Sequence, residues 1–190
     1  MTARTLALAC LLVAACAPVS ADLPVADAPL ADATPHERLA DAVRAADRAA
    51  LAGDEAALAG ALAEIDALGG RPLDPTGEVQ LAAWRAQSGA PSIPLRGRTL
   101  GRGYRSGTIT AGSNMVIEQT FLSGQKASIA LSATDGKVLG LSVLDGKEKP
   151  VCREQSQRTS CSWIPLFTQR HTIRVRNPGP REVRYFLVID

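Results

Sequence analysis

The chain has 190 residues, a formal net charge of +2 at pH 7, 46% hydrophobic residues and only 4% aromatic residues. This is an ordinary globular mixture, long enough to bury a sizeable core in one domain or in a domain with an appendage, and aliphatic residues must supply most of that core. After residue 15 no stretch is apolar and long enough to be a candidate for a membrane span.

The two halves of the chain carry opposite charge. Residues 22–90 contain 12 Asp and Glu against 5 Arg, a net charge of −7, and residues 91–190 contain 15 Lys and Arg against 7 Asp and Glu, a net charge of +8. The asymmetry is either chance surface composition, or an attraction between the halves, or the sign of an anionic partner for the basic half.

The N-terminus is typical of a targeting segment, and we expect residues 1–21 to be a signal peptide. Arg4 precedes an apolar run over residues 6–15, which is too short to span a bilayer. Cleavage before Cys16, in a lipobox-like context, would make this cysteine a lipidated N-terminus; cleavage before Asp22 would leave no lipid. Both cleavage sites predict export. We expect the protein in the periplasm or, if it is a lipoprotein, at the outer membrane, and we favour these locations over full secretion from the cell.

A helical section is expected over residues 34–90, after an Ala/Pro/Asp-rich tether at residues 22–33. Thr34 and Glu37 have the spacing of a capping box, and Pro35 stands at the first helical position. A helix should therefore begin at this point.

Two further helices follow from the same kind of signal. Gly53 should end the first helix and Asp54 should cap a second, so that the single-glycine link favours an antiparallel hairpin. A third, short helix is expected over residues 76–87. On the first helix, Asp47 and His36 are expected to be solvated.

The section after Pro91 is predicted to be a β-domain, because turn signals separate short runs of alternating apolar and polar residues. These signals stand at residues 111–114, 123–124, 135–136, 145–146 and 177–180. The expected fold class is therefore α+β: an N-terminal helical hairpin followed, over residues 91–190, by an antiparallel, jelly-roll-like β-sandwich of about seven or eight strands.

Cys152 and Cys161 are the two cysteines that remain after the signal segment and Cys16, and in an exported protein we expect them to form a disulfide bond. The bond would close a polar loop over residues 153–160 and would stabilise the fold by about 2.7 kcal/mol through chain entropy. Because no Cys-x-x-Cys motif or nearby histidine completes a ligand set, no metal site is expected.

The last two strands permit a prediction of register. Pairing Val175 with Val183 puts their apolar neighbours on one buried face, and it sets Arg174 opposite Arg184 on the outer face. Arg174, Arg176 and Arg184 are therefore expected to form a basic surface that binds a partner. The final strand is apolar on both faces, and the acidic helices are available to cover it.

Five short motifs carry a resemblance to a known family. They are YRSG at 104–107, FLSGQKA at 121–127, LSVLD at 141–145, IRVRN at 173–177 and YFLV at 185–188. The run over residues 103–190 resembles the bacterial pre-peptidase C-terminal domain, a small β-sandwich of secreted proteins. The resemblance implies a non-catalytic accessory domain, and some members of that family bind extracellular polymers.

No catalytic or cofactor-binding motif accompanies these features. The glycine-rich stretch at 101–107 lacks the lysine and the following helix of a phosphate loop, and no nucleophile elbow occurs. His171 is expected to be a core or edge residue of a strand. Export and the lack of stacking aromatic residues argue against a nucleic-acid partner.

The function expected from the sequence is that of a non-enzymatic envelope protein, a β-sandwich binding or assembly module without a cofactor. Its partner would be another envelope protein or an anionic polymer, and it would meet the membrane only through an N-terminal lipid. Two alternatives stay open: a secreted hydrolase of unrecognised type that uses His171, and recognition by the helical section with the sandwich as a scaffold.

Overall fold

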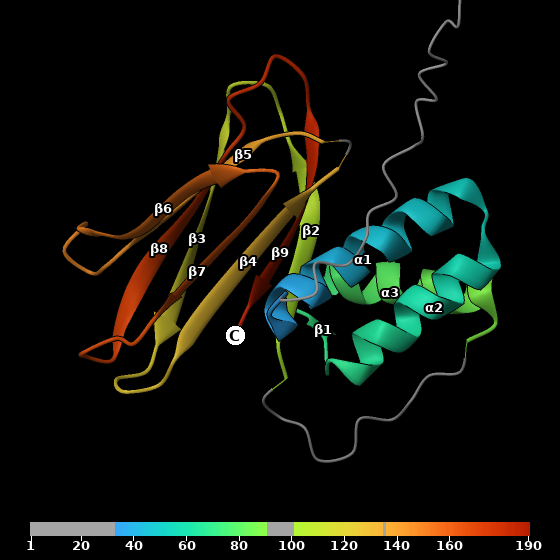
Figure 1. Cartoon of the computed structure of the whole chain (residues 1–190), viewed down its shortest axis with the longest axis horizontal. Coiled ribbons are helices and arrows are strands. Elements are labelled where there is room, and N and C mark those ends of the chain that lie inside the picture. Colours follow the sequence, from blue (N-terminus) through green and yellow to red (C-terminus); the bar gives the residue numbers. More distant parts are fainter. Residues whose placement is uncertain (1–32, 91–100, 135) are drawn as a thin grey trace, which may run out of the picture.

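The computed structural model describes residues 33–90, 101–134 and 136–190. The predicted signal peptide, Cys16 and the predicted tether up to residue 32 lie outside the described residues. Within these residues, three helices lie on one side of a two-layered β-sandwich, and the first helix packs against two strands of the sandwich (Figure 1). None of the helices in the described ranges is long and apolar enough to cross a membrane.

The first two helices begin where their capping signals predict, and the third extends one residue further at each end than the expected range of 76–87. They are α1 (Pro35–Ala52), α2 (Glu55–Ala67) and α3 (Pro75–Ser88). The Glu37 carboxylate accepts a hydrogen bond from the Thr34 backbone N–H at 2.8 Å, as in a capping box, and Gly53 ends α1 with a φ of 70°. The side chain of Asp54 accepts a hydrogen bond from the N–H of Ala57 at 2.9 Å and so caps α2.

In the part of the chain that the structure describes, nine strands form two sheets, ordered β1-β2-β9-β4-β7 and β3-β8-β5-β6. The strands are β1 (Arg71–Pro72), β2 (Gly103–Ile109), β3 (Asn114–Phe121), β4 (Ala127–Ala133), β5 (Leu139–Leu144), β6 (Pro150–Ser156), β7 (Arg158–Trp163), β8 (Gln169–Arg176) and β9 (Val183–Ile189). Strands β2 to β9 make two four-stranded antiparallel sheets in jelly-roll order, and β1 joins the edge of one of them in parallel with β2. The predicted α+β class with a jelly-roll-like sandwich is confirmed.

The core between the two sheets is aliphatic, as the composition predicts. Ile173 and Val175 on β8 meet Val183, Tyr185 and Leu187 on β9 within one buried cluster. The expectation that these residues share a core is therefore correct.

The predicted pairing of β8 with β9 is wrong. Strand β8 pairs with β3 and β5, and β9 pairs with β2 and β4, so the two strands face each other across the core. Pro178 and Pro180 in the connection have no N–H for a tight hairpin. The buried Asn177 side chain instead donates to the carbonyls of Ile109 and Arg181, at 3.0 and 2.7 Å, and holds the crossing between sheets.

The stretch between the two cysteines is also more regular than predicted. Instead of one polar loop, it contains the end of β6 and the start of β7, which meet at Gln157. Because β6 belongs to the four-stranded sheet and β7 to the five-stranded sheet, the chain changes layer here. The outward-facing positions of both edge strands are polar, which is why the sequence resembles a loop.

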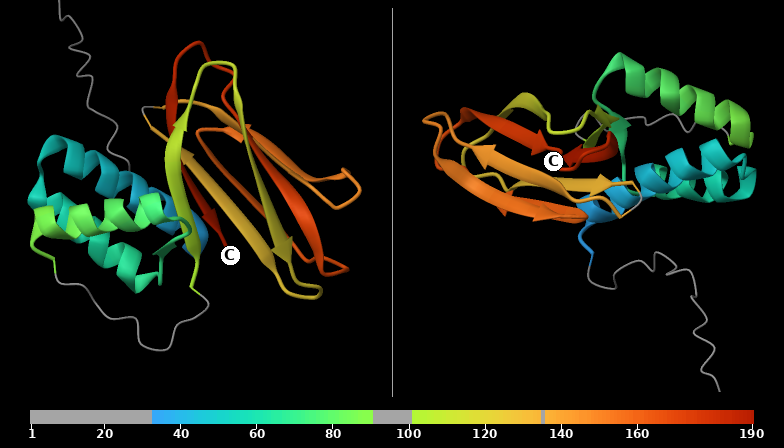
Figure 2. Two further views of the ribbon diagram at one scale, coloured as in Figure 1. Left: turned by 180° about the vertical axis from the view of Figure 1, so that it is seen from behind. Right: turned by 90° about the horizontal axis from the view of Figure 1, so that it is seen from above.

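The helices cover the outer face of the five-stranded sheet (Figure 2). Phe186 and Val188 on β9 and Tyr104 on β2 are buried with the apolar side chains of α1 and α2 in a second core cluster. This explains the strand that is apolar on both faces: one face fills the sandwich and the other binds the helices. The expectation that the acidic helices cover it is confirmed.

The prediction that His36 is solvated is wrong, because its side chain is only 5% exposed. The first turn of α1 lies against the sheet, where Glu37 accepts a hydrogen bond from Ser160 of β7 at 2.6 Å. The imidazole Nε2 lies 3.1 Å from the hydroxyl of Thr34, and burial lowers the pKa of His36.

Candidate functional site

The outer face of the four-stranded sheet is the part of the sandwich that turns away from the helices (Figure 1). On its strand β8, Ile173 and Val175 are fully buried, so that the alternate residues Arg174 and Arg176 point outward and are exposed. These two arginines were predicted to lie on a binding face. About 6.7 Å of strand separates their Cα atoms.

The neighbouring strand β5 leaves a hollow beside these arginines. Gly140 lies opposite Arg176 and Ser142 lies opposite Arg174, so the middle of the face carries almost no side-chain volume. A Cβ atom added at Gly140 would have as its nearest neighbour the Cβ of Arg176, at 3.7 Å. The hollow therefore comes from the small size of the two β5 residues.

Strand β6 supplies the other wall. Arg153 lies opposite Ser142 and Gln155 lies opposite Gly140. Arg174, Ser142 and Arg153 thus form one row across three strands, with about 9.6 Å between the Cα atoms of the two arginines. The resulting hollow has a volume of about 560 Å³. We call it the basic hollow; it is lined by Asn114, Gly140, Leu141, Ser142, Arg153, Glu154, Gln155, Arg174 and Arg176.

The arginines of the basic hollow form no ion pair with any residue that the structure describes. Within the described ranges, Arg153, Arg174 and Arg176 have no carboxylate oxygen within 4.0 Å. Glu154 pairs in register with the buried Leu141, so its side chain leaves β6 on the side opposite to Arg153. The lining of the hollow thus contains three arginines and one glutamate, and none of the three arginines forms an ion pair with a described residue.

Arg170, on the same face, shows the contrast. Its guanidinium Nη1 lies 3.0 Å from Oε2 of Glu118 on β3, and both side chains are well exposed. This arginine is already paired and stands outside the lining of the basic hollow. It offers a matched control for experiments on the other three.

Arg184 does not belong to this surface, which corrects the expected set of three. It lies on β9 in the other sheet, where its Nη2 atom is 2.7 Å from Oδ1 of Asp47 on α1. Asp47, expected to be solvated, is only 4% exposed and also accepts a hydrogen bond from Gln80 at 3.2 Å. Burial raises the pKa of Asp47, and the neighbouring Arg184 opposes that rise.

The opposite charges of the two halves meet at the interface of helices and sheet. Three carboxylates of the helical section are ion-paired with arginines of the β section: Asp41 with Arg158 at 3.1 Å, Asp74 with Arg105 at 2.8 Å, and Asp47 with Arg184 at 2.7 Å. Attraction between the halves, one of the three interpretations that the sequence left open, is therefore present. The arginines of the basic hollow are outside this interface and remain available to a partner.

The predicted disulfide bond is present and stands next to the hollow. It joins Cys152 on β6 to Cys161 on β7, with 6.0 Å between their Cα atoms. Since β6 and β7 belong to different sheets, the bond connects the two layers at the edge of the sandwich. Arg153 directly follows the first cysteine, so the bond also fixes the strand that carries it.

His171 has the environment of a core residue. It is 1% exposed, and its ring lies 5.4 Å from the rings of both Phe121 and Trp163. Its Nδ1 atom is 3.2 Å from the backbone oxygen of Gln169. A histidine so enclosed is out of reach of a substrate, which removes the residue on which the hydrolase alternative depended. Among the described residues, no three His, Cys, Asp or Glu side chains gather in a way that could hold a metal ion.

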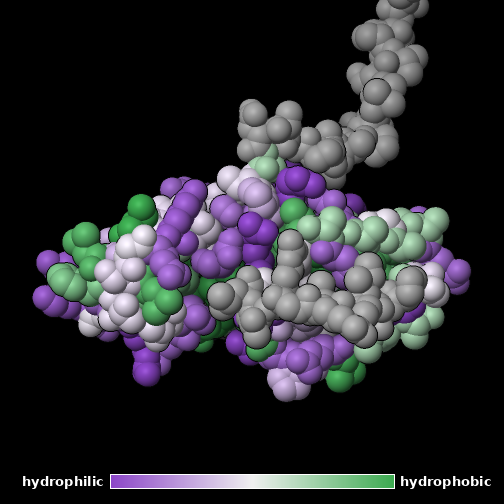
Figure 3. All heavy atoms as spheres, turned by 90° about the horizontal axis from the view of Figure 1, so that it is seen from below, coloured by the Kyte–Doolittle hydropathy of each residue, from purple (hydrophilic) through white to green (hydrophobic). Residues whose placement is uncertain are grey.

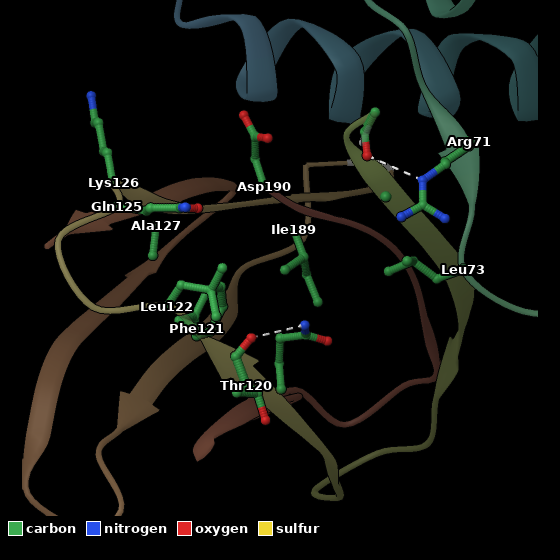
Figure 4. Close-up of a pocket in the computed structure, with 13 residues that line it drawn as sticks. Arg71, Leu73, Thr120, Phe121, Leu122, Gln125, Lys126, Ala127, Ile189 and Asp190 are labelled. Atoms are coloured by element: carbon green, nitrogen blue, oxygen red, sulfur yellow. Dashed lines mark hydrogen bonds between the residues drawn. The ribbon is translucent and has the colours of Figure 1, made fainter. Parts of the chain in front are cut away.

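A second cavity, of about 310 Å³, opens at one end of the sandwich (Figure 4). Leu73 and Ile189 point toward its middle, and Lys126 points away from it. Arg71 lies at its edge and donates a hydrogen bond to the backbone oxygen of Gly101 at 3.2 Å. Its lining combines Arg71, Lys126 and Asp190 with apolar side chains, whereas the basic hollow has three arginines.

Arg153 was missed by sequence reasoning because it stood in the presumed loop between the cysteines. The alternation of Val151, Arg153 and Gln155 with Cys152 and Glu154 was the available signal, since Cys152 must face its partner in the core. A short alternating run over residues 151–154 was recognised, but it was not assigned an inner and an outer face, which would have placed Arg153 outward.

The sandwich has similar folds among solved structures, although no family model and no curated protein matches the chain. The pre-peptidase C-terminal domain of a collagenase from Bacillus anthracis is 11% identical, with a TM-score of 0.42 over 46% of this chain and 87% of that one. The mitogen YPM of Yersinia pseudotuberculosis is 16% identical, with a TM-score of 0.40 over 47% and 84%. PliG of Aeromonas hydrophila, a periplasmic inhibitor of g-type lysozyme, is 9% identical, with a TM-score of 0.38 over 47% and 84%. The first belongs to the family that the sequence resembles, and the likeness concerns the fold alone.

Proposed function

We propose that this protein is a non-enzymatic, exported binding module, and that the basic hollow binds an anionic polymer of the cell envelope. The observation that carries the proposal is the set of three arginines, Arg153, Arg174 and Arg176, which surround a floor of Gly140 and Ser142 and have no acidic partner in the described ranges. Arginine side chains bind carboxylate, phosphate and sulfate groups through paired N–H donors.

The shape of the hollow favours a polymer over a folded protein. The lining is polar and contains no aromatic anchor of the kind that dominates the centre of protein interfaces. The arginines are spaced by about 6.7 Å along one strand and about 9.6 Å across the sheet, so that a chain of repeating anionic units can meet two or three of them in succession. The disulfide bond supports export to an oxidising compartment.

Binding to charged and neutral polymers tests the proposal. The full-length exported protein is titrated with dextran sulfate, polygalacturonate and polyphosphate, and neutral dextran serves as the matched ligand without charge. We expect binding to at least one of the three polyanions and none to dextran. Replacing Arg153, Arg174 and Arg176 together with Gln should weaken that binding at least about tenfold, because three charge-assisted contacts are lost.

Arg170→Gln is the control variant, since it removes one positive charge from the same face outside the hollow. It should leave the affinity within about twofold of the wild-type value. The proposal is wrong if none of the polyanions binds, or if the triple variant binds as tightly as the wild type.

A further inference from the structure

Two loops at one end of the sandwich expose a group of large apolar side chains. Leu122 belongs to the β3–β4 loop, and Ile164, Leu166 and Phe167 belong to the β7–β8 loop. Their exposed fractions are 50%, 62%, 83% and 71%, respectively. We call these four residues the apolar tip. Figure 3, viewed from below, shows hydrophobic surface at this sandwich end of the molecule.

The apolar tip is a built structure, because the two loops are joined by three hydrogen bonds. The backbone N–H of Gly124 donates to the oxygen of Pro165 at 2.9 Å, and the Ser123 hydroxyl donates to the oxygen of Leu166 at 2.7 Å. The N–H of Ser123 also donates to the hydroxyl of Thr168 at 3.0 Å. The loops therefore hold their apolar side chains outward by their own backbone geometry.

The base of the tip is packed as firmly as its loops. The rings of Phe121 and Trp163, which directly precede the exposed residues of each loop, meet edge to face at 4.9 Å and enclose His171. Pro165 is buried between the exposed residues on either side of it. Exposed apolar side chains on such a rigid support mark a contact surface, since a soluble protein gains nothing from displaying them to water.

The charge around the tip fits a lipid headgroup layer. Residues 121–127 and 163–169 contain no Asp or Glu, and Lys126 supplies one positive charge. The β5–β6 turn lies beside Gln169 and carries two acids and two lysines, so that it adds no net charge. Arg170, just beyond the second loop, is paired with Glu118. Aromatic and aliphatic side chains with a cation beside them are the composition by which surface-bound proteins enter the boundary between headgroups and acyl chains.

The start of the described chain lies at the same end of the sandwich. Strand β9 ends at Ile189, which pairs with Ile129 near the start of β4. The first turn of α1 lies close to this end, because His36 interacts electrostatically with Lys126 and Asp190 (Figure 1). The cysteine that the sequence marks for lipidation, Cys16, precedes Ala33 by 17 residues. That length reaches at most about 60 Å, so a lipid at Cys16 and the tip can meet one bilayer.

We propose that the apolar tip inserts into the surface of a phospholipid bilayer and orients the sandwich on it. The insertion is independent of the basic hollow, because it buries apolar side chains instead of pairing charges. It gives the protein a membrane contact of its own, in addition to the predicted lipid.

Vesicle sedimentation tests the proposal with the lipid removed. All chains carry Cys16→Ser, and the vesicles contain equal amounts of phosphatidylethanolamine and phosphatidylglycerol. The chain with an intact tip should sediment with the vesicles and should continue to do so at high salt. Leu166→Ser with Phe167→Ser should reduce the partition coefficient at least about tenfold, because two large apolar side chains no longer leave water.

Leu51→Ser with Val79→Ser is the control, since both side chains are highly exposed on the helices, at 81% and 72%. It should sediment like the parent chain, and all chains should melt at the same temperature. The proposal fails if the parent chain stays in solution, if salt alone releases it, or if the tip variant sediments equally. Self-association that depends on the tip, without vesicle binding, would overturn it in favour of a contact between copies.

Discussion

Arg174 and Arg184 are separated by ten residues of sequence, yet they lie on different sheets and in opposite electrostatic environments. Arg184 is bound to the buried carboxylate of Asp47 at 2.7 Å, beneath α1. Arg174 lines the basic hollow and has no carboxylate partner among the residues that the structure describes. Arg184 therefore stabilises the fold, whereas Arg174 is one of the residues that we propose to contact a ligand.

Arg184→Ala should destabilise the protein by about 2 kcal/mol, because it leaves the Asp47 carboxylate buried without its counter-ion. This expected loss is smaller than that for a fully buried ion pair, because the Arg184 side chain is 33% exposed. Urea denaturation measures the change. Arg170→Ala, which breaks the exposed pair with Glu118, should cost less than about 1 kcal/mol. Equal losses in the two variants would contradict the assignment.

Gly140→Val should weaken polyanion binding without harming the fold. A Cβ at this position makes only ordinary contact with Arg176, and valine favours an extended strand. It fills the floor of the basic hollow while every arginine remains. We expect an affinity loss of several fold in a titration with dextran sulfate, and an unfolding free energy equal to or above that of the wild type. Unchanged affinity would show that the hollow is not occupied.

The stability of the fold should decrease as the pH falls below neutrality, because of His36. Burial lowers the pKa of His36 below its ordinary value of 6.5; the carboxylates of Glu37 and Asp190 oppose this, and Lys126 and Arg102 add to it. The unfolded chain therefore binds the proton more readily than the folded protein, and stability that is present above pH 6.5 is lost as the pH falls toward the folded pKa.

Urea denaturation at a series of pH values between about 7.5 and 5.5 checks this expectation. His36→Gln should have a flatter profile than the wild type over that interval, since glutamine cannot take up the proton. A profile with the same slope in both proteins would assign the pH dependence to other groups.

Loss of the disulfide bond should lower the free energy of unfolding by about 2.7 kcal/mol, the chain-entropy value for a loop of about ten residues. The double variant Cys152→Ser with Cys161→Ser removes the bond, and the wild type in reductant should show the same decrease in the free energy of unfolding. Because the bond fixes β6 next to Arg153, polyanion affinity should fall modestly as well. An unfolding free energy equal to that of the oxidised wild type would show that the bond does not restrain the unfolded chain.

Local signals in the sequence predicted the helices and the sandwich class well. Thr34, Gly53 and Asp54 define helix ends through hydrogen bonds within a few residues, and the strand boundaries follow turn residues in the same way. The cover of Phe186 by the helices was also predictable, because a strand with two apolar faces needs a partner on each.

Pairing between distant strands was beyond the same reasoning. The alternation of apolar and polar residues in the strands of Val175 and Val183 requires only that both valines face the core. Two strands on opposite sheets meet this requirement as well as two paired strands do. The wrong pairing of β8 with β9 therefore placed Arg184 on the same face as Arg174. The prediction that Asp47 is solvated was wrong for a related reason. A charged residue beside an apolar stripe is expected to be exposed unless the position of its counter-ion on another element is known.

The salt dependence of polyanion affinity tests the central claim most directly. Dissociation constants for dextran sulfate are measured over a range of NaCl concentrations for the wild type, for Arg170→Gln, and for the variant with Gln at 153, 174 and 176. If the basic hollow is the binding site, the slope of the logarithm of the dissociation constant against the logarithm of the salt concentration should fall by roughly 2 to 3 in the triple variant. The reason is that each arginine that neutralises an anionic group releases about one counter-ion. The slope should be unchanged in Arg170→Gln. Equal slopes in all three proteins would contradict the account and would place the binding surface elsewhere.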